Sequence, residues 1–110
     1  MIDWTRVACL RQEIGEEDFD EVVRLFIEEA SEVVERLERS ASPPQREADL
    51  HFLKGSALNL GFTELAALCQ GEERAAASGY EVETAPVIGL YLASRRAFLA
   101  GLSTRSGAAA

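Results

Sequence analysis

Residues 19–37 read FDEVVRLFIEEASEVVERL, and the apolar pattern of this stretch decides the fold. Its apolar residues recur at the i, i+3, i+4, i+7 spacing of an amphipathic helix, which buries one face and exposes the other. They are Phe19, Val22, Val23, Phe26, Ile27, Ala30, Val33, Val34 and Leu37. Acidic residues at 16–18 suit the positive end of a helix dipole, and Pro43 and Pro44 cannot continue a helix. We therefore predict a long helix that ends near Arg39.

Four more segments carry helical signals, and none shows the sustained alternation that marks a strand. The first is capped by Asp3, runs to about Glu13 and is closed by Gly15. The other three, the first of which stops at Gly61, cover about 43–60, 62–78 and 84–102. Helices that are apolar on one side and joined by short connections pack most economically as a bundle. We predict an all-α fold, an antiparallel up-and-down four-helix bundle with a short additional N-terminal helix as its lid.

The length and net charge of the chain limit the number of domains and the partners that it can have. A chain of 110 residues fits one domain, and we expect a bundle domain over 1–102 and a disordered tail, STRSGAAA, over 103–110. Nineteen acidic against eleven basic residues give a net charge of -8, which repels nucleic acid and anionic lipid unless a basic patch exists. The sequence shows no such patch. It also shows neither a signal-peptide pattern nor an apolar run of roughly 18 residues, so we expect a cytoplasmic protein that does not bind membranes.

The two cysteines point to no metal or disulfide chemistry. Cys9 and Cys69 are isolated, and a single histidine is the only other candidate ligand of the zinc type. Free cysteine is usually buried, so both are expected to be small core residues.

The only histidine, His51, lies in the run HFLKGSALNLG at residues 51–61. Because the periodicity of a helix is 3.6 residues, four apolar residues in or directly before this run fall on the sides opposite to or below the imidazole. They are Leu50, Leu53, Ala57 and Leu60. The imidazole therefore faces outward. Four residues at i-4, i+3, i+4 and i+7 share its face, namely Glu47, Lys54, Gly55 and Leu58.

This face has a chemical interpretation. A neutral imidazole carries a nitrogen lone pair near physiological pH and can attack a phosphoryl group. The Lys54 ammonium would then attract the phosphate oxygens. A glycine in the middle of a helix costs roughly 1 kcal/mol against alanine, so Gly55 suggests that a partner comes close. Leu58 and Glu47 would lie at the contact with that partner.

The run HFLKGSALNLG resembles the histidine-containing phosphotransfer (HPt) domain family, whose usual pattern is HxLKGSAxxLG. The opening IDWTRVACLRQEIGEEDFDEVVRLFIEEASEVVERL is similar to the first two helices of such domains, so the resemblance covers most of the chain. It implies that His51 takes a phosphoryl group on a ring nitrogen and exchanges it with an aspartate of a response-regulator receiver domain. It also implies that a hybrid or other sensor histidine kinase is a partner.

The resemblance assigns roles to neighbouring residues as well. Lys54 would assist the phosphate and Gly55 would leave room for the active site of the receiver, whereas the remaining matched positions would be structural. Asp49 and Leu50 depart from the pattern, because small residues are common there. Asp49 projects toward the inner half of the helix wheel, and no partner for it can be read from the sequence.

No nucleotide-binding motif accompanies the histidine. The chain has no P-loop, no Gly-rich nucleotide fingerprint and no carboxylate cluster suited to magnesium. We therefore expect a monomeric phosphocarrier without an ATP site, kinase activity or cofactor, whose receiver partner supplies the magnesium.

Other interpretations stay open. A solitary helical histidine is often incidental, and Gly55 taken alone is a tolerated glycine or a close contact between helices. The alternative function is a non-phosphorylated helical adaptor that binds a signalling partner through Leu58. A histidine-based hydrolase would need a positioned nucleophile, and Ser56 lies on the other side of the helix. The sequence does not identify the kinase, the regulators, the direction of phosphoryl flow or the stimulus.

Overall fold

The computed structural model describes residues 1–39 and 42–109, and these residues form five helices. The helices are α1 (Trp4–Ile14), α2 (Glu16–Arg39), α3 (Pro43–Leu60), α4 (Thr63–Ala77) and α5 (Thr84–Ala109). Over the described residues there is no strand, and one isolated antiparallel bridge joins Ile2 to Phe62. The predicted all-α bundle with a short N-terminal helix is confirmed. The Ser40–Ala41 part of the predicted turn lies outside the described residues.

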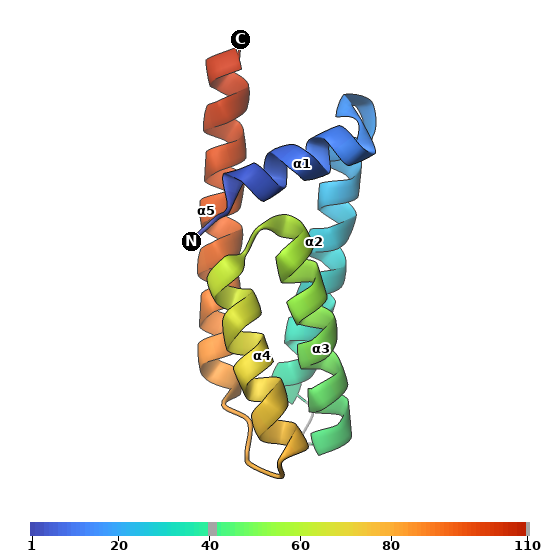
Figure 1. The fold of residues 1–110 in the computed structure, drawn as a ribbon, viewed down its shortest axis with the longest axis vertical. Coiled ribbons are helices and arrows are strands. Elements are labelled where there is room, and N and C mark those ends of the chain that lie inside the picture. Colours follow the sequence, from blue (N-terminus) through green and yellow to red (C-terminus); the bar gives the residue numbers. More distant parts are fainter. Residues whose placement is uncertain (40–41, 110) are drawn as a thin grey trace.

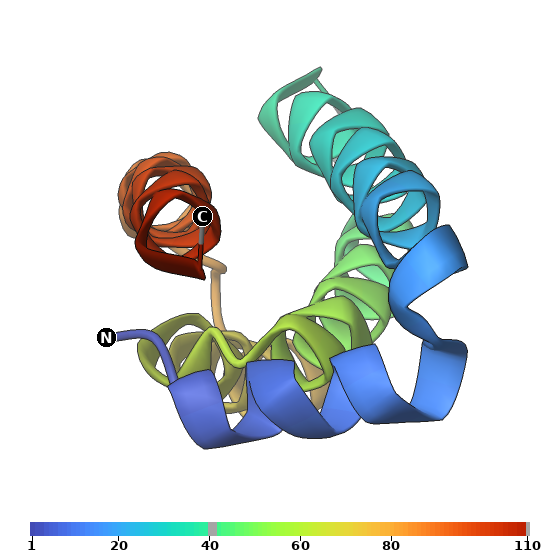
Figure 2. The ribbon, with the colours of Figure 1, turned by 90° about the horizontal axis from the view of Figure 1, so that it is seen from above.

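The four long helices run alternately up and down, and α1 crosses the end of the bundle at which α3 turns into α4 (Figure 1). Seen from above, α1 lies over that end as a lid, while α2 and α5 stand on one side of the α3–α4 pair, with α2 beside α3 and α5 beside α4 (Figure 2). The most extensive packing joins α3 and α4. The helix that carries His51 is therefore held firmly on its α4 side.

The corner between α3 and α4 depends on Gly61. This residue has φ +78°, a left-handed conformation that favours glycine. A Cβ at this position would lie 2.7 Å from the carbonyl oxygen of Asp3, so a larger residue would also clash with the start of α1. The Asp3 N–H donates to the Gly61 carbonyl at 2.8 Å, and the Asp3 carboxylate accepts from two N–H groups of the first turn of α1. One glycine thus ends α3 and anchors the lid.

A single apolar core runs through the bundle. The largest fully buried apolar side chains come from α2, α3, α4, α5 and the corner after α3: Phe19, Leu37, Leu50, Leu53, Leu60, Phe62, Leu65, Val87, Tyr91 and Phe98. At the lid, Trp4 stacks on Phe98 with ring centroids 6.0 Å apart, and Phe62 meets the same ring edge-on at 5.4 Å. Burial of these aromatic faces, together with that of Val7 and Leu10, fixes α1 to the bundle.

The structure differs from the sequence predictions in two regions. The backbone of 103–109 continues α5 instead of forming a disordered tail, since no proline interrupts it and the alanines at its end favour the helix. Ala110 lies outside the described residues, and the domain limit at residue 102 stays a prediction. Cys69 is buried as predicted, but Cys9 is exposed. It falls on the outer side of α1, whose buried residues are Val7 and Leu10.

Candidate functional site

The predicted site residues lie on the side of α3 that faces away from the core. The side chain of His51 is 68% exposed, and Leu58 is 56% exposed. Gly55 is also exposed, whereas Glu47 and Lys54 are half-buried. The helical spacing therefore brings an accessible imidazole, an ammonium and an apolar side chain to one surface.

Sequence reasoning missed Glu73, which reaches this surface from α4. Its carboxylate Oε2 lies 2.9 Å from His51 Nδ1, and its Oε1 lies 3.2 Å from Lys54 Nζ. Glu73 is four residues beyond the buried Cys69, so it continues the inner stripe of α4. An acidic residue on an apolar stripe was the signal that could have revealed it.

The Glu73 carboxylate fixes the proton on the imidazole. Partial burial works to raise the pKa of Glu73, but the hydrogen bonds from His51 and Lys54 prevail and lower it. The carboxylate is therefore ionised near neutral pH and can only accept hydrogen bonds. His51 Nδ1 must donate to it, which leaves Nε2 of the neutral ring as the nitrogen with the free lone pair.

The surroundings of Gly55 are open. A Cβ at this position would meet no atom of the described residues within 4 Å beyond its own helix. Packing inside the molecule therefore does not require glycine here, and a close contact between helices does not explain it.

A shallow groove of about 200 Å³ lies beside Lys54, between α3 and α4. Its lining residues are Glu47, Lys54, Gln70, Glu73, Arg74 and Ala77. The Arg74 guanidinium forms no ion pair with a described residue, so its charge is available at the edge of the site.

Asp49 has a partner that the sequence did not reveal. This carboxylate is only 1% exposed, and it accepts from Arg36 Nε at 2.9 Å, Arg36 Nη2 at 2.7 Å and Gln45 Nε2 at 2.9 Å. Arg36 of α2 therefore pairs across to α3, where the Asp49 carboxylate is desolvated and accepts a bidentate contact. The hydrogen bonds and charge of Asp49 raise the pKa of the Arg36 guanidinium, and Glu32 adds to this effect. The contact joins α2 to α3 two residues before His51.

The buried Cys69 thiol, below the site, is not a competing nucleophile. Burial, with a further contribution from the nearby Glu73 carboxylate, raises its pKa to about 12. The thiolate, which is the reactive form, is therefore negligible near neutral pH.

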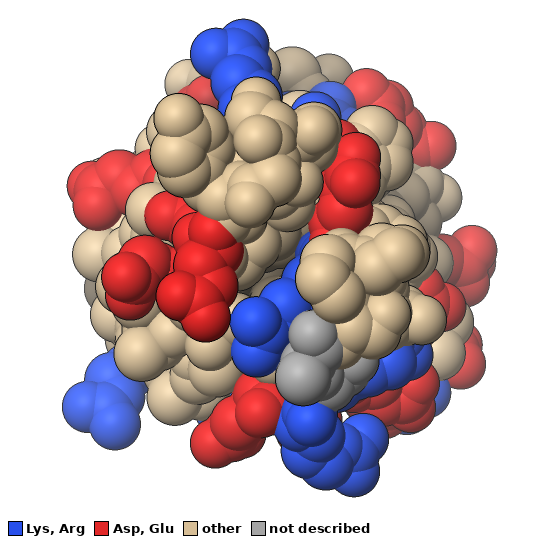
Figure 3. Space-filling view, turned by 90° about the horizontal axis from the view of Figure 1, so that it is seen from below, with Lys and Arg blue, Asp and Glu red and all other residues tan. Residues whose placement is uncertain are grey.

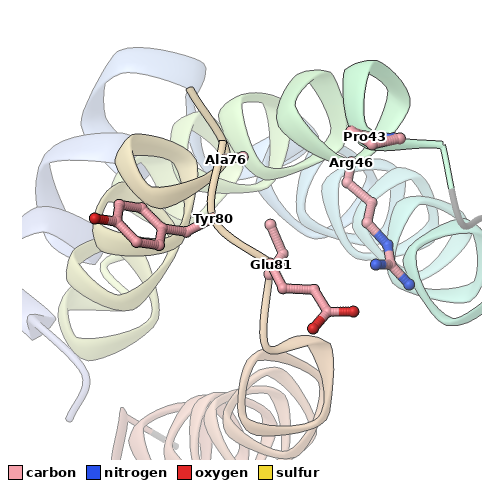
Figure 4. Close-up of a pocket in the computed structure, with 6 residues that line it drawn as sticks. Pro43, Arg46, Ala76, Tyr80 and Glu81 are labelled. Atoms are coloured by element: carbon pink, nitrogen blue, oxygen red, sulfur yellow. The ribbon is translucent and has the colours of Figure 1, made fainter. Parts of the chain in front are cut away.

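The far end of the bundle offers no comparable chemistry. A hollow there is lined by Pro43, Arg46, Ala76, Tyr80, Glu81 and Val82, and the Tyr80 ring points away from the side of Pro43 and Arg46 (Figure 4). Seen from below, this end shows acidic and basic side chains interspersed, not gathered into one basic surface (Figure 3). Within 1–39 and 42–109, no helix is long and apolar enough to cross a bilayer.

The fold and the site define a class of protein, a helical bundle that presents one histidine on the outside of a helix. Comparison with protein families agrees, because the model of the Hpt domain matches residues 21–100. Searches among curated proteins and among solved structures found no match. The chain belongs to the Hpt domain family. Hpt domains are phosphocarrier modules that perform histidine phosphotransfer in two-component phosphorelays, where they interact with receiver and kinase components.

Proposed function

We propose that His51 is the phosphoacceptor of this protein and that it exchanges the phosphoryl group with an aspartate of a response-regulator receiver domain. The observation that carries this proposal is an exposed imidazole whose Nδ1 donates to Glu73 while Lys54 stands beside it. This arrangement supplies a nucleophilic nitrogen and a cation for the phosphate on one accessible face.

The transfer step follows from this arrangement. The lone pair of His51 Nε2 attacks the phosphorus of the aspartyl phosphate, a P–N bond forms, and the P–O bond to the aspartate breaks. The aspartate leaves as a carboxylate, and the imidazole becomes positively charged. The Glu73 carboxylate, 2.9 Å from Nδ1, stabilises that charge and keeps the proton on Nδ1. The reverse sequence returns the phosphoryl group to a receiver.

The other residues of the face assist this step. Before the reaction, Lys54 Nζ forms an ion pair with Glu73. After the reaction, the same ammonium can turn toward the phosphate oxygens. The open space at Gly55 allows the active-site loops of the receiver to approach the imidazole. Leu58, together with Glu47 at the rim of the groove, lies where the receiver would make contact. Phe52, which follows His51 and is 43% exposed, offers a further apolar contact to the receiver. The sequence analysis did not predict this role.

The rest of the chemistry belongs to the partners. In this proposal the receiver supplies the magnesium ion and the aspartate, and a hybrid or other sensor histidine kinase supplies the phosphoryl group. The protein needs no cofactor or ATP site of its own, and it acts as a cytoplasmic monomer.

The test is transfer of radioactive phosphate from a phosphorylated receiver to this protein. We expect label that is lost in acid and kept in alkali, and we expect none on the His51→Gln variant. Binding of receivers without transfer of label would favour the alternative, a helical adaptor that carries no phosphate. Equal labelling of His51→Gln would place the phosphoryl group elsewhere and reject the proposal.

A further inference from the structure

Exposed apolar side chains continue from the His51 face onto α2. Leu25 on α2 is 45% exposed, and Phe52 and Leu58 on α3 are 43% and 56% exposed. Monomeric proteins seldom gather large apolar side chains at the surface unless a partner covers them. Apolar side chains that a partner could cover are therefore present on α2 as well as on α3.

The register between α2 and α3 places two acidic residues inside this surface. The Arg36–Asp49 ion pair fixes one point of contact between the antiparallel helices. Since both helices rise about 1.5 Å per residue, Glu32 lies level with Leu53 and Glu29 lies level with Ser56, each one residue beyond Phe52 and Gly55 of the exposed face. Leu25, Glu29, Glu32 and Arg36 follow the i, i+4, i+7, i+11 spacing and form one strip along the edge of α2 that borders α3. Glu32 is close enough to Arg36 to contribute to its raised pKa, which agrees with this placement.

The opposite edge of the surface is basic. Arg74 on α4 lines the groove beside Lys54, and both Arg74 and the two glutamates are exposed. None of these three side chains forms an ion pair with another described residue. Lys54 and Arg36, by contrast, are held by Glu73 and Asp49. The exposed charge without an ion pair is thus negative at Glu29 and Glu32 on the α2 side of His51 and positive at Arg74 on the α4 side, where the half-buried Glu47 of α3 lines the same groove.

We propose that this charge asymmetry selects and orients the receiver that exchanges phosphate with His51. The matching receiver presents a basic side chain over Glu29 and Glu32 and an acidic side chain over Arg74, with apolar residues between them. This inference rests on the proposed function and adds the chemistry of the partner to it. Complementary charges at the rim of an interface speed association and penalise wrong partners more than they add to affinity. The receiver therefore docks in one orientation across α2, α3 and α4.

The experiment measures transfer from a panel of receivers that have been phosphorylated with a small phosphodonor. The receiver that phosphorylates the wild type fastest is then tested on the double variant Glu29→Lys/Glu32→Lys. We expect the second-order transfer rate constant to fall about tenfold or more at low salt, because steering by charge is lost. We expect Arg74→Glu to act in the same direction, and the wild-type rate to fall more steeply with salt than the rate of the double variant.

Glu38→Lys is the matched control. It makes the charge change of one member of the lysine pair on the same helix, but nine residues from Glu29, about two and a half turns, place it on the opposite side of α2. We expect its rate to stay within about twofold of the wild type. If the lysine pair loses helicity, the double variant Glu29→Gln/Glu32→Gln is tested in its place. We expect this neutral pair to slow transfer less than the lysine pair. The charge inference is overturned, and the proposed function is kept, if a receiver labels wild-type His51 but its transfer rate constant falls no more with either double variant than with Glu38→Lys. Absence of transfer from every receiver overturns the proposed function and this inference together.

Discussion

Glu73 determines how the single histidine can react. Its carboxylate accepts from His51 Nδ1 and contacts Lys54 Nζ, so one side chain sets both the proton on the ring and the position of the cation. Hydrogen bonds to a charged group contribute about 1.5 to 3 kcal/mol in mutational series. Glu73 is therefore a positioning residue whose loss should be visible in the rate of transfer.

Replacing Glu73 with glutamine tests this role. The amide can accept from Nδ1 or donate to it, so the ring loses its fixed tautomer and the forming imidazolium loses a counter-charge. We expect phosphoryl transfer to slow roughly 10- to 100-fold, the range that corresponds to such a hydrogen bond. Nitrogen chemical shifts of the imidazole should show a mixture of tautomers in the variant. An unchanged rate with an unchanged tautomer would contradict the role.

The lowered pKa of Glu73 also predicts how stability depends on pH. A carboxyl group whose pKa is lower in the folded state binds fewer protons there than in the unfolded chain, where its ordinary value is 4.5. The stabilisation is therefore complete above the unfolded pKa and is lost as the pH falls through the folded pKa.

Urea unfolding of the wild type and of Glu73→Gln at a series of pH values measures this contribution. We expect the wild type to lose its advantage in the free energy of unfolding as the pH falls below about 4.5. A difference between the two proteins that stays constant into strong acid would argue against an ion pair at this position.

At the scale of helices, the sequence alone predicts the features that depend on residue spacing within one helix. The outward face of α3, the capping by Asp3 and the left-handed stop at Gly61 are local features of the chain. The contacts of Glu73 and Asp49 depend instead on how α4 and α2 are set against α3, and helical periodicity contains no information on register between helices. For the same reason the sequence shows no partner for Asp49, although Arg36 of α2 forms an ion pair with it.

Gly55 gives a prediction that belongs to α3. A side chain at this position meets open space, and leucine has the higher helix propensity, so Gly55→Leu should raise the free energy of unfolding by up to about 1 kcal/mol. If a receiver approaches closely here, the same change should slow transfer strongly. Gly71→Leu on α4 is the control, since its surroundings are equally open. A Gly55→Leu protein that is stabilised and transfers as fast as Gly71→Leu would show that close approach is unnecessary.

At the scale of the whole molecule, the bundle is an elongated body of 50 × 21 × 20 Å with His51 near the middle of α3. If His51 is the phosphoacceptor, as proposed, a receiver binds along the side of the bundle and not at its lid. The lid and the C-terminal part of α5 lie away from that position, and α5 extends past α1 (Figure 1). We therefore expect phosphoryl transfer not to depend on the C-terminal end of α5.

Removal of 103–110 tests the predicted domain limit. Among the α5 residues whose burial is described, up to residue 104, the last fully buried one is Phe98, and Leu102 is half-buried. We expect the shortened protein to keep its helical bundle, its melting temperature within a few degrees, and its full transfer rate. A large fall in melting temperature would show that the helical continuation to Ala109 is part of the folded unit.

The most direct test of the central claim is to identify the atom that carries the phosphoryl group. Nuclear magnetic resonance of the phosphorylated protein, with labelled imidazole nitrogens, distinguishes Nε2 from Nδ1 and His51 from every other residue. The structure predicts phosphate on Nε2 of His51, because Nδ1 is engaged by Glu73. Phosphate on Nδ1, or on any residue other than His51, would contradict the account.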